Sequence, residues 1–219
     1  GMLDKLAKMA DGSYEGLSSD GIAGEDPLPV LDGTLNIYAD VYEDSINALR
    51  NSFSRLVLNI KGNYYVRFKD PEFQRLVVAK WSTDGVGVTQ AQLNAITKFP
   101  RGVCEGNVGV VDLSDFGNKF VSCNIMEYSV FENCSNLEFI KFPDNPIRIE
   151  NNAFKNCVNL SFDLPVNCSL GAGCFTSTGI IDLVIKRGVT FNGTSNFSRC
   201  VKLETAIFEE GCTVVIDSI

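Results

Sequence analysis

The strongest constraint in the sequence is a spacing of phenylalanine, cysteine and leucine that returns along its second half. Residues 131–142 set the pattern with five apolar positions, which are Phe131, Cys134, Leu137, Ile140 and Phe142. The same order returns at 154–165 and 197–208, and a weaker copy at 175–185 has Thr178 in the cysteine position. Successive cysteine positions lie 21 to 23 residues apart. This period is too short for repeating helix pairs and predicts a solenoid of short stacked units.

Each unit is expected to contribute one short strand near residues 137–142, followed by a turn and an irregular return. The return carries an apolar residue five places before the next phenylalanine, as Ile149 and Leu170 show. A single unit cannot bury these side chains, so neighbouring units must bury them against each other. Free cysteine is small and readily buried. We therefore expect Cys134, Cys157 and Cys200 to form a column beneath the strands.

The helical period ends near residue 100, and we divide the chain there. Residues 1–33 are rich in Gly, Ser, Asp and Pro and predict an irregular lead-in. Asp70-Pro71 is a strong helix start. Residues 34–103 are predicted to form a small α+β region, with strands at 34–40 and 63–68 and helices at 44–56, 71–80 and 89–97. Residues 104–219 are predicted to form the solenoid, with about four to five units.

Composition narrows the function classes. The chain has no histidine, which removes the usual general base and most catalytic zinc sites, so we do not expect an enzyme. The net charge of −8 argues against a nucleic-acid partner, which needs a basic footprint. No stretch approaches the length of a membrane-spanning segment. We expect no cofactor and no metal.

Eight cysteines raise the question of disulfides. No CxxC pair occurs, so a zinc ribbon or a redox motif has no support. We expect most of the thiols to be reduced and buried. Four cysteines are less well explained by the repeat, and a Cys168–Cys212 or a Cys104–Cys123 bridge stays open as an alternative.

The repeat CxxLxxIxFPxxxxxIxxxAFxxC at 134–157 resembles the leucine-rich repeats of BspA-like bacterial surface antigens. The resemblance covers roughly residues 110–219. It is weaker in later units, where Thr178 replaces cysteine and Lys186 replaces proline. It implies an α+β chain in which a leucine-rich-repeat solenoid of short strands follows a small α+β N-terminal region.

The segment 68–97 is similar to the one that precedes such repeats in many gut Bacteroides proteins, where an EF-hand-like loop follows a helix ending in tryptophan. This loop is degenerate, because Ser82 and Val86 stand at acidic positions. Only Asp84 and Gln92 remain as oxygen donors, whereas calcium needs six to eight oxygens. We expect no calcium site and interpret the segment as a helix–loop–helix unit that caps the solenoid.

The resemblance also implies a cell-surface or secreted protein with a role in adhesion or in host and microbial contact. The sequence as given shows no signal peptide, since residues 2–10 have no long apolar core. Gly1 resembles a scar of tag cleavage. Met2 is then the native start, or the native chain begins earlier with a signal that the given sequence does not include, and both alternatives stay open. A cytoplasmic location therefore stays an alternative.

A binding surface is expected where the positions between the inward residues of each strand line an exposed sheet. Four of them, Phe139, Ile181, Val184 and Ile207, would form an exposed apolar strip of the kind that marks interaction surfaces. The nine candidate positions are Glu138, Phe139, Lys141, Ile181, Asp182, Val184, Glu204, Thr205 and Ile207. The alternative is that a loop, the N-terminal region or a second copy of the chain covers this strip.

Three functions follow from these features. The first is a non-enzymatic interaction module that binds a protein or glycan partner through the exposed sheet. The second is a structural or assembly protein that forms homo-oligomers through the end of the solenoid. The third is an enzyme that uses carboxylates, and nothing beyond the presence of acidic residues supports it.

Overall fold

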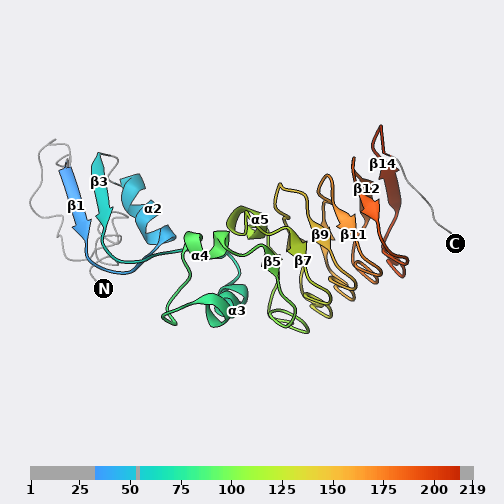
Figure 1. The fold of residues 1–219 in the computed structure, drawn as a ribbon, viewed down its shortest axis with the longest axis horizontal. Coiled ribbons are helices and arrows are strands. Elements are labelled where there is room, and N and C mark those ends of the chain that lie inside the picture. The colour runs from blue at the N-terminus through green and yellow to red at the C-terminus, as the bar shows by residue number, and fades with distance from the viewer. Residues whose placement is uncertain (1–32, 53–54, 213–219) are drawn as a thin grey trace, which may run out of the picture. The chain divides into compact units, whose positions relative to one another are not determined.

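The computed structural model describes residues 33–52 and 55–212. The chain divides by contact into two compact units, one ending at Arg67 and the other beginning at Phe68. Figure 1 shows the elements of each unit in chain order. The helix–loop–helix segment after Phe68 thus belongs by contact with the repeats and not with the strands before it. The lead-in, placed at 1–33, lies almost wholly outside the described residues, and the three-part division 1–33, 34–103 and 104–219 stays a prediction.

The first unit pairs its strands in parallel. Strand β1 (Gly33–Ile37) pairs with β3 (Leu56–Ile60), and β2 (Val41–Tyr42) pairs with β4 (Tyr64–Tyr65). Helix α2 (Glu43–Ser52) buries Ile46 and Leu49 in a core with Ile37 and Val41. Acidic residues in its first turn match the positive end of the helix dipole.

Three sequence predictions in this unit were wrong in extent. The strand expected over 34–40 ends at Ile37. The helix expected over 44–56 ends by Ser52, because Leu56 already begins β3; Phe53 lies outside the described residues. The strand expected over 63–68 is limited to Tyr64–Tyr65. Beyond it the backbone donates to a side chain, since the Arg67 amide bonds the Glu43 carboxylate at 3.1 Å.

The second unit opens with two helices where the sequence predicts them, although the helix expected over 89–97 already ends at Asn94. Helix α3 (Pro71–Trp81) begins after its N-cap Asp70, and α4 (Gln90–Asn94) begins after Thr89, which forms a capping box with Gln92. A third short helix, α5 (Phe116–Lys119), follows. The Phe73 ring of α3 lies 5.9 Å from Phe99 and 6.0 Å from Phe116, which joins α3 to the first repeat.

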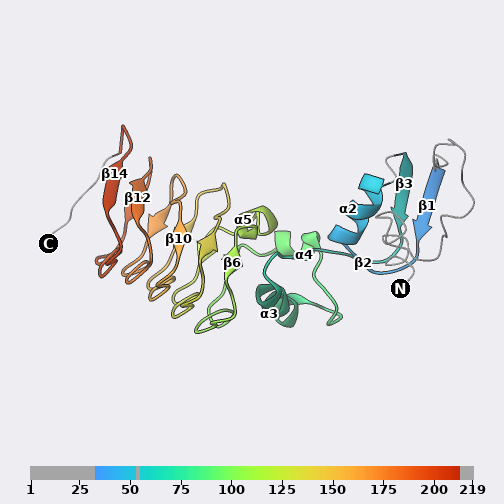
Figure 2. The same cartoon turned by 180° about the vertical axis from the view of Figure 1, so that it is seen from behind.

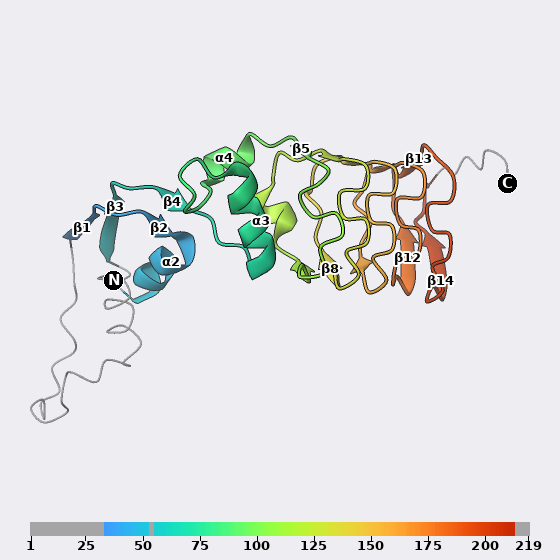
Figure 3. The ribbon, with the colours of Figure 1, turned by 90° about the horizontal axis from the view of Figure 1, so that it is seen from below.

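The repeats carry two rows of parallel strands on opposite sides, as Figure 3 shows. One row is a five-stranded sheet made of β5 (Lys98–Phe99), β7 (Ile125–Met126), β9 (Arg148–Ile149), β11 (Ser169–Leu170) and β13 (Thr190–Phe191). The other row divides into two sheets. Its three-stranded part is β6 (Asp112–Leu113), β8 (Phe139–Ile140) and β10 (Ser161–Phe162), and its two-stranded part is β12 (Asp182–Ile185) and β14 (Thr205–Phe208).

The predicted solenoid of short strands is confirmed, with two corrections. The return was expected to be irregular, yet it contains a second strand in each unit, at β9 around Ile149 and at β11 around Leu170. The paired strands also begin earlier than residue 104, because β5 at Lys98–Phe99 already pairs with β7. Strands of two residues present one inward side chain each, which is too little for a period of two to appear in the sequence.

A ladder of phenylalanine rings fills the centre of the repeats. Successive rings lie nearly parallel: Phe99 to Phe131 at 5.5 Å, Phe131 to Phe154 at 5.0 Å, Phe154 to Phe175 at 5.3 Å and Phe175 to Phe197 at 5.7 Å. These separations are close to the spacing of about 4.8 Å between paired strands, so one ring per unit stacks on the next. The spacing in the sequence is therefore the cross-section of the solenoid.

The turn after each strand of the five-stranded row requires positive φ at two positions in each unit. The first position has φ between 55° and 62° and is held by Ser129, Asn152, Gly173 and Ser195. Asn133, Asn156, Ser177 and Arg199 hold the second. Asparagine and glycine tolerate this conformation best, which explains the Asn-Cys pairs of the repeat.

The cysteine column is a hydrogen-bonded ladder as well as a packing element. The Cys134 thiol donates to the Cys104 carbonyl at 2.9 Å, and the Cys157 thiol donates to the Phe131 carbonyl at 3.0 Å. Thr178 keeps a donor in the degenerate unit, with its hydroxyl on the Phe175 carbonyl at 3.0 Å. A small side chain with a donor is thus what this position requires. All eight cysteines are free thiols, so neither alternative bridge is formed.

Asp70 connects α3 to β6, the first strand of the row that also contains β8, β10, β12 and β14. We call this row the outer row. The Oδ1 of Asp70 caps the helix by accepting from the Phe73 amide at 2.8 Å. Its Oδ2 accepts from the Val111 amide at 2.7 Å and from the Asp112 amide at 3.0 Å. The Val111 carbonyl serves the next unit in the same way, accepting from Glu138 at 2.9 Å. A carboxylate therefore replaces the missing preceding strand at this edge of the sheet.

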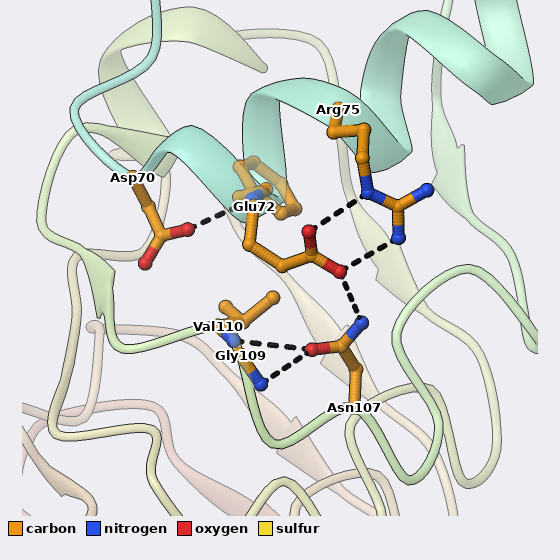
Figure 4. Close-up of polar contacts among 7 residues, drawn as sticks. Asp70, Glu72, Arg75, Asn107, Gly109 and Val110 are labelled. Carbon is orange, nitrogen blue, oxygen red and sulfur yellow. Dashed lines mark hydrogen bonds and ion pairs between the residues drawn. The ribbon is translucent and has the colours of Figure 1, made fainter.

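A second polar contact joins α3 to the turn before β6. Figure 4 shows Asn107 between Glu72 and the backbone of Gly109 and Val110. Its amide donates to Glu72 at 2.8 Å, and its oxygen accepts from the Gly109 amide at 2.7 Å. The ion pair with Arg75 and the bond from Asn107 lower the pKa of Glu72 to about 2. The first repeat is thus bonded to side chains at the edge where each later repeat is bonded to the repeat before it.

Replacing Asp70 should lower the free energy of unfolding of the repeats more than replacing an exposed aspartate does. Asp70→Asn leaves one acceptor oxygen for three backbone amides, so at least one buried amide loses its partner, at about 1–3 kcal/mol. Asp144→Asn, at an exposed position, should change the free energy of unfolding by less than about 0.5 kcal/mol. Urea unfolding followed by circular dichroism measures both. Equal stability of the two variants would contradict the capping role of Asp70.

The thiols should divide into two reactivity classes. Cys200 and Cys212 are half-buried and the other six are buried. Burial raises the pKa of Cys134 from its usual 9.0 to about 12, which suppresses the reactive thiolate. Iodoacetamide at pH 8 should label Cys200 and Cys212 first, and the buried thiols only in urea, as peptide mass spectrometry would show. Labelling of Cys134 as fast as Cys200 would contradict the buried column.

The same burial sets a dependence of stability on pH. The raised pKa of a buried thiol contributes stability that is complete below the unfolded value near 9.0 and is lost as pH rises toward the folded value. The free energy of unfolding should therefore fall between about pH 9 and about pH 12.

Candidate interaction surface

The outer row of strands presents an exposed face made of alternating side chains. Figure 2 shows β6, β10, β12 and β14 following one another along the repeats. In β12 the burial alternates, with Asp182 exposed, Leu183 buried, Val184 half-buried and Ile185 buried. Residues that pair across strands share a face, so Thr205 continues from Asp182 and Ile207 from Val184.

Eight of the nine positions named from the sequence are exposed on this row, and Val184 is half-buried. Phe139 is 52% exposed, Ile181 48% and Ile207 57%, which is high for large apolar side chains. The structure brings Phe139, Lys141, Ile181 and Asp182 together around one shallow depression. Glu138 does not line this depression. Thr205 and Ile207 lie on the strand beyond it, and Glu204 directly precedes that strand. A role for these residues in binding stays a prediction.

The sequence analysis expected a strand in the unit of β10 but named no surface position on it. Ser161 and Asp163 of this unit are exposed and line the depression, as does Ser114 after β6. The reason is a deletion: Leu137 is followed by two residues before the buried Ile140, but Leu160 by only one before the buried Phe162. Aligning Phe162 with Ile140 and Leu164 with Phe142 would have found these positions.

The depression lies where the outer row is interrupted. It has a volume of about 460 Å³ and is lined by residues of β8, β10 and β12. Strands β10 and β12 belong to separate sheets, and the small Ser161 pairs with the large Phe139 of β8. The deletion and the serine together remove the side-chain volume that would otherwise level the face. Apolar walls from Phe139 and Ile181 remain on either side.

The charge of this face is predominantly negative. Glu138, Asp163, Asp182 and Glu204 are exposed at outward positions, and no ion pair involves them among residues 33–52 and 55–212. Lys141 is the basic residue at an outward position, and its ammonium donates to the Asn118 side chain at 2.9 Å. The Asp182 carboxylate accepts a hydrogen bond from the Thr205 hydroxyl, which is neutral, so its charge is not compensated. Carboxylates without an ion pair beside apolar side chains create a negative potential at the depression.

A second depression, of about 480 Å³, lies among the turns after β9, β11 and β13. Its polar side chains largely bond to each other. Asn156 donates to Asn133 at 2.8 Å, and the Thr176 hydroxyl donates to the Ser195 carbonyl at 2.8 Å. Groups that already have partners offer less to a ligand, so the outer row is the stronger candidate.

The loop that resembles an EF-hand uses its oxygen atoms internally. Asp84 accepts from the Val86 amide at 2.8 Å, and the Gln92 oxygen accepts from the Thr89 amide at 2.7 Å. Among the residues that the structure describes, no group of three or more histidine, cysteine, aspartate or glutamate side chains is arranged to hold a metal ion. The expectation of no calcium site stays a prediction.

No helix within the described ranges has the length and apolar character needed to cross a membrane.

One family model matches the repeats, and one solved structure is similar to part of the chain. A family model described as the BspA type leucine rich repeat region matches residues 119–219 in six copies. A crystal structure of a leucine-rich repeat protein from Bacteroides ovatus is 26% identical over 51% of this chain, with a TM-score of 0.44. The match covers 28% of that protein. No curated protein matches the chain.

Leu183 of β12 and Ile181, which directly precedes this strand, should respond differently to truncation. Leu183 is 5% exposed and points inward, so Leu183→Ala should cost about 2–5 kcal/mol of unfolding free energy. Ile181→Ala removes a side chain from the outward face and should cost less than about 1 kcal/mol. Chemical denaturation of both variants tests the assignment. A larger loss for Ile181→Ala would show that Ile181 packs into the core.

Proposed function

The repeats of this chain are BspA-type leucine-rich repeats, and on this premise we propose that the chain is a non-enzymatic module that binds a protein partner through its outer row of strands. Leucine-rich solenoids use extended surfaces for recognition. We define the outer face as the outward side chains of β8, β10, β12 and β14 with the residues that directly precede these strands.

The observation that carries the proposal is the apolar strip on a rigid ladder of strands. Phe139, Ile181 and Ile207 are each about half exposed. Beside the first two, Ile140 and Ile180 are packed in the core, whereas every residue of β14 is exposed. Contiguous apolar side chains rimmed by polar ones are typical of protein-binding surfaces. The strands fix these side chains by backbone pairing, so little conformational entropy is lost on binding.

The same face gives little support to an enzyme. Its carboxylates lie at exposed positions, whereas a general acid near neutral pH needs a carboxyl group with a desolvated setting. A protein partner is favoured over a glycan because the strip is apolar. A location at the cell surface and a role in adhesion are part of the proposal and rest on the family resemblance alone.

A second candidate is assembly through the last described repeat. Phe208 lies opposite the buried Ile185 in the strand pairing, yet it is 53% exposed. A second copy of the chain that covers Phe208 would remove this apolar surface from water. Light scattering that shows a monomer at high concentration would contradict this candidate.

Charged substitutions on the outer face test the first function. A library of random linear peptides and a glycan array supply the probes, and biolayer interferometry measures their affinity for the intact chain. Phe139→Glu, Ile181→Glu and Ile207→Glu should each weaken peptide binding about tenfold or more, since each buries a charge in the interface.

Val201→Glu is the matched control, because Val201 is 90% exposed in the turn before β14 and lies off the face. It should leave the affinity unchanged. Peptides that bind all four variants equally would show that another surface binds, and selection of glycans alone would replace the protein partner.

A further inference from the structure

We infer that the outer face selects a polypeptide segment in which an apolar side chain is flanked by lysine or arginine. This inference rests on the proposed function and adds the chemistry of the partner. It depends on two features of the face: the depression between β8 and β12, and the carboxylates at its edge, for which the described residues provide no ion pair.

The depression provides a place for one apolar side chain. Phe139 and Ile181 line it on either side of Ser161, whose short side chain leaves the space between them open. Its volume of about 460 Å³ exceeds that of any single side chain, so an anchor and part of its flanking chain can enter. Burial of an apolar side chain between two others supplies the affinity.

The carboxylates decide which residues flank the anchor. Asp163 and Asp182 line the same depression, and Glu138 and Glu204 lie just before β8 and β14. Lys141 also lines it and keeps its positive charge, with its ammonium held against the neutral Asn118 side chain, so the carboxylates of the face outnumber it. A segment with acidic residues would place like charges together, whereas lysine or arginine beside the anchor gives the carboxylates a partner.

The apolar anchor is expected to supply most of the binding affinity, and the carboxylates most of the selectivity. An exposed ion pair contributes little, so neutralising one carboxylate should weaken binding only about two- to fivefold. The charges act together on association, which should slow as salt rises from about 0.01 M to about 0.15 M and the screening length falls from about 30 Å to about 8 Å.

The test is selection of random linear peptides on the intact chain, followed by affinity measurements on variants. We expect enrichment of lysine and arginine on both sides of a large apolar residue. Asp163→Asn and Asp182→Asn should each weaken the selected peptides about two- to fivefold. Glu210→Gln removes the same charge from the turn after β14 and should have no effect. Ser161→Trp should fill the depression and abolish binding.

The outcomes separate the two proposals. Peptides that lose binding on Phe139→Glu but show no cationic preference, or that ignore Asp163→Asn and Asp182→Asn, would overturn the inference and leave the proposed function intact. Peptides that bind Ser161→Trp normally would overturn the assignment of the depression. Failure to select any peptide that depends on Phe139 would overturn both.

Discussion

The stacking of one phenylalanine per repeat is the interaction on which the rest of the second unit depends. Rings about 5 Å apart require the backbone to advance by one strand spacing per turn. Each repeat must then return to the same position within 21 to 23 residues. This short return requires the two positions with positive φ and the small hydrogen-bonding residue at the position of Cys157 or Thr178. The outward residues of each strand are not constrained by this packing.

A stack of identical units has an edge problem, because the first strand lacks a neighbour to accept its hydrogen bonds. Asp70 solves it with one carboxylate, since one oxygen caps α3 and the other accepts from Val111 and Asp112. The helix is thereby fixed to the edge that it covers. An interpretation of residues 68–97 as a cap thus gains a physical basis in hydrogen bonding rather than in metal binding.

The parts of the structure that repeat could be predicted, and those that arise once could not. Phe131 and Cys134 revealed the stack because they recur at a fixed period. The Asp70-Pro71 pair announced a helix start, but its bond to Val111 spans 41 residues and has no local signal. The strands of the five-stranded row were missed because each is two residues long, and the surface positions of β10 were missed because one residue is deleted before it.

That deletion is also where the outer face differs from a regular solenoid. A strict repeat would place a residue at the position that Glu138 holds in one repeat and Ile181 in another. The repeat of β10 lacks this residue, so Ser161 directly follows the buried leucine. The core tolerates the deletion, since Phe162 still stacks on Phe175 at 4.2 Å. The deletion therefore leaves the core packed but creates a depression in the surface. A solenoid of identical repeats would otherwise present a flat face with no distinctive site.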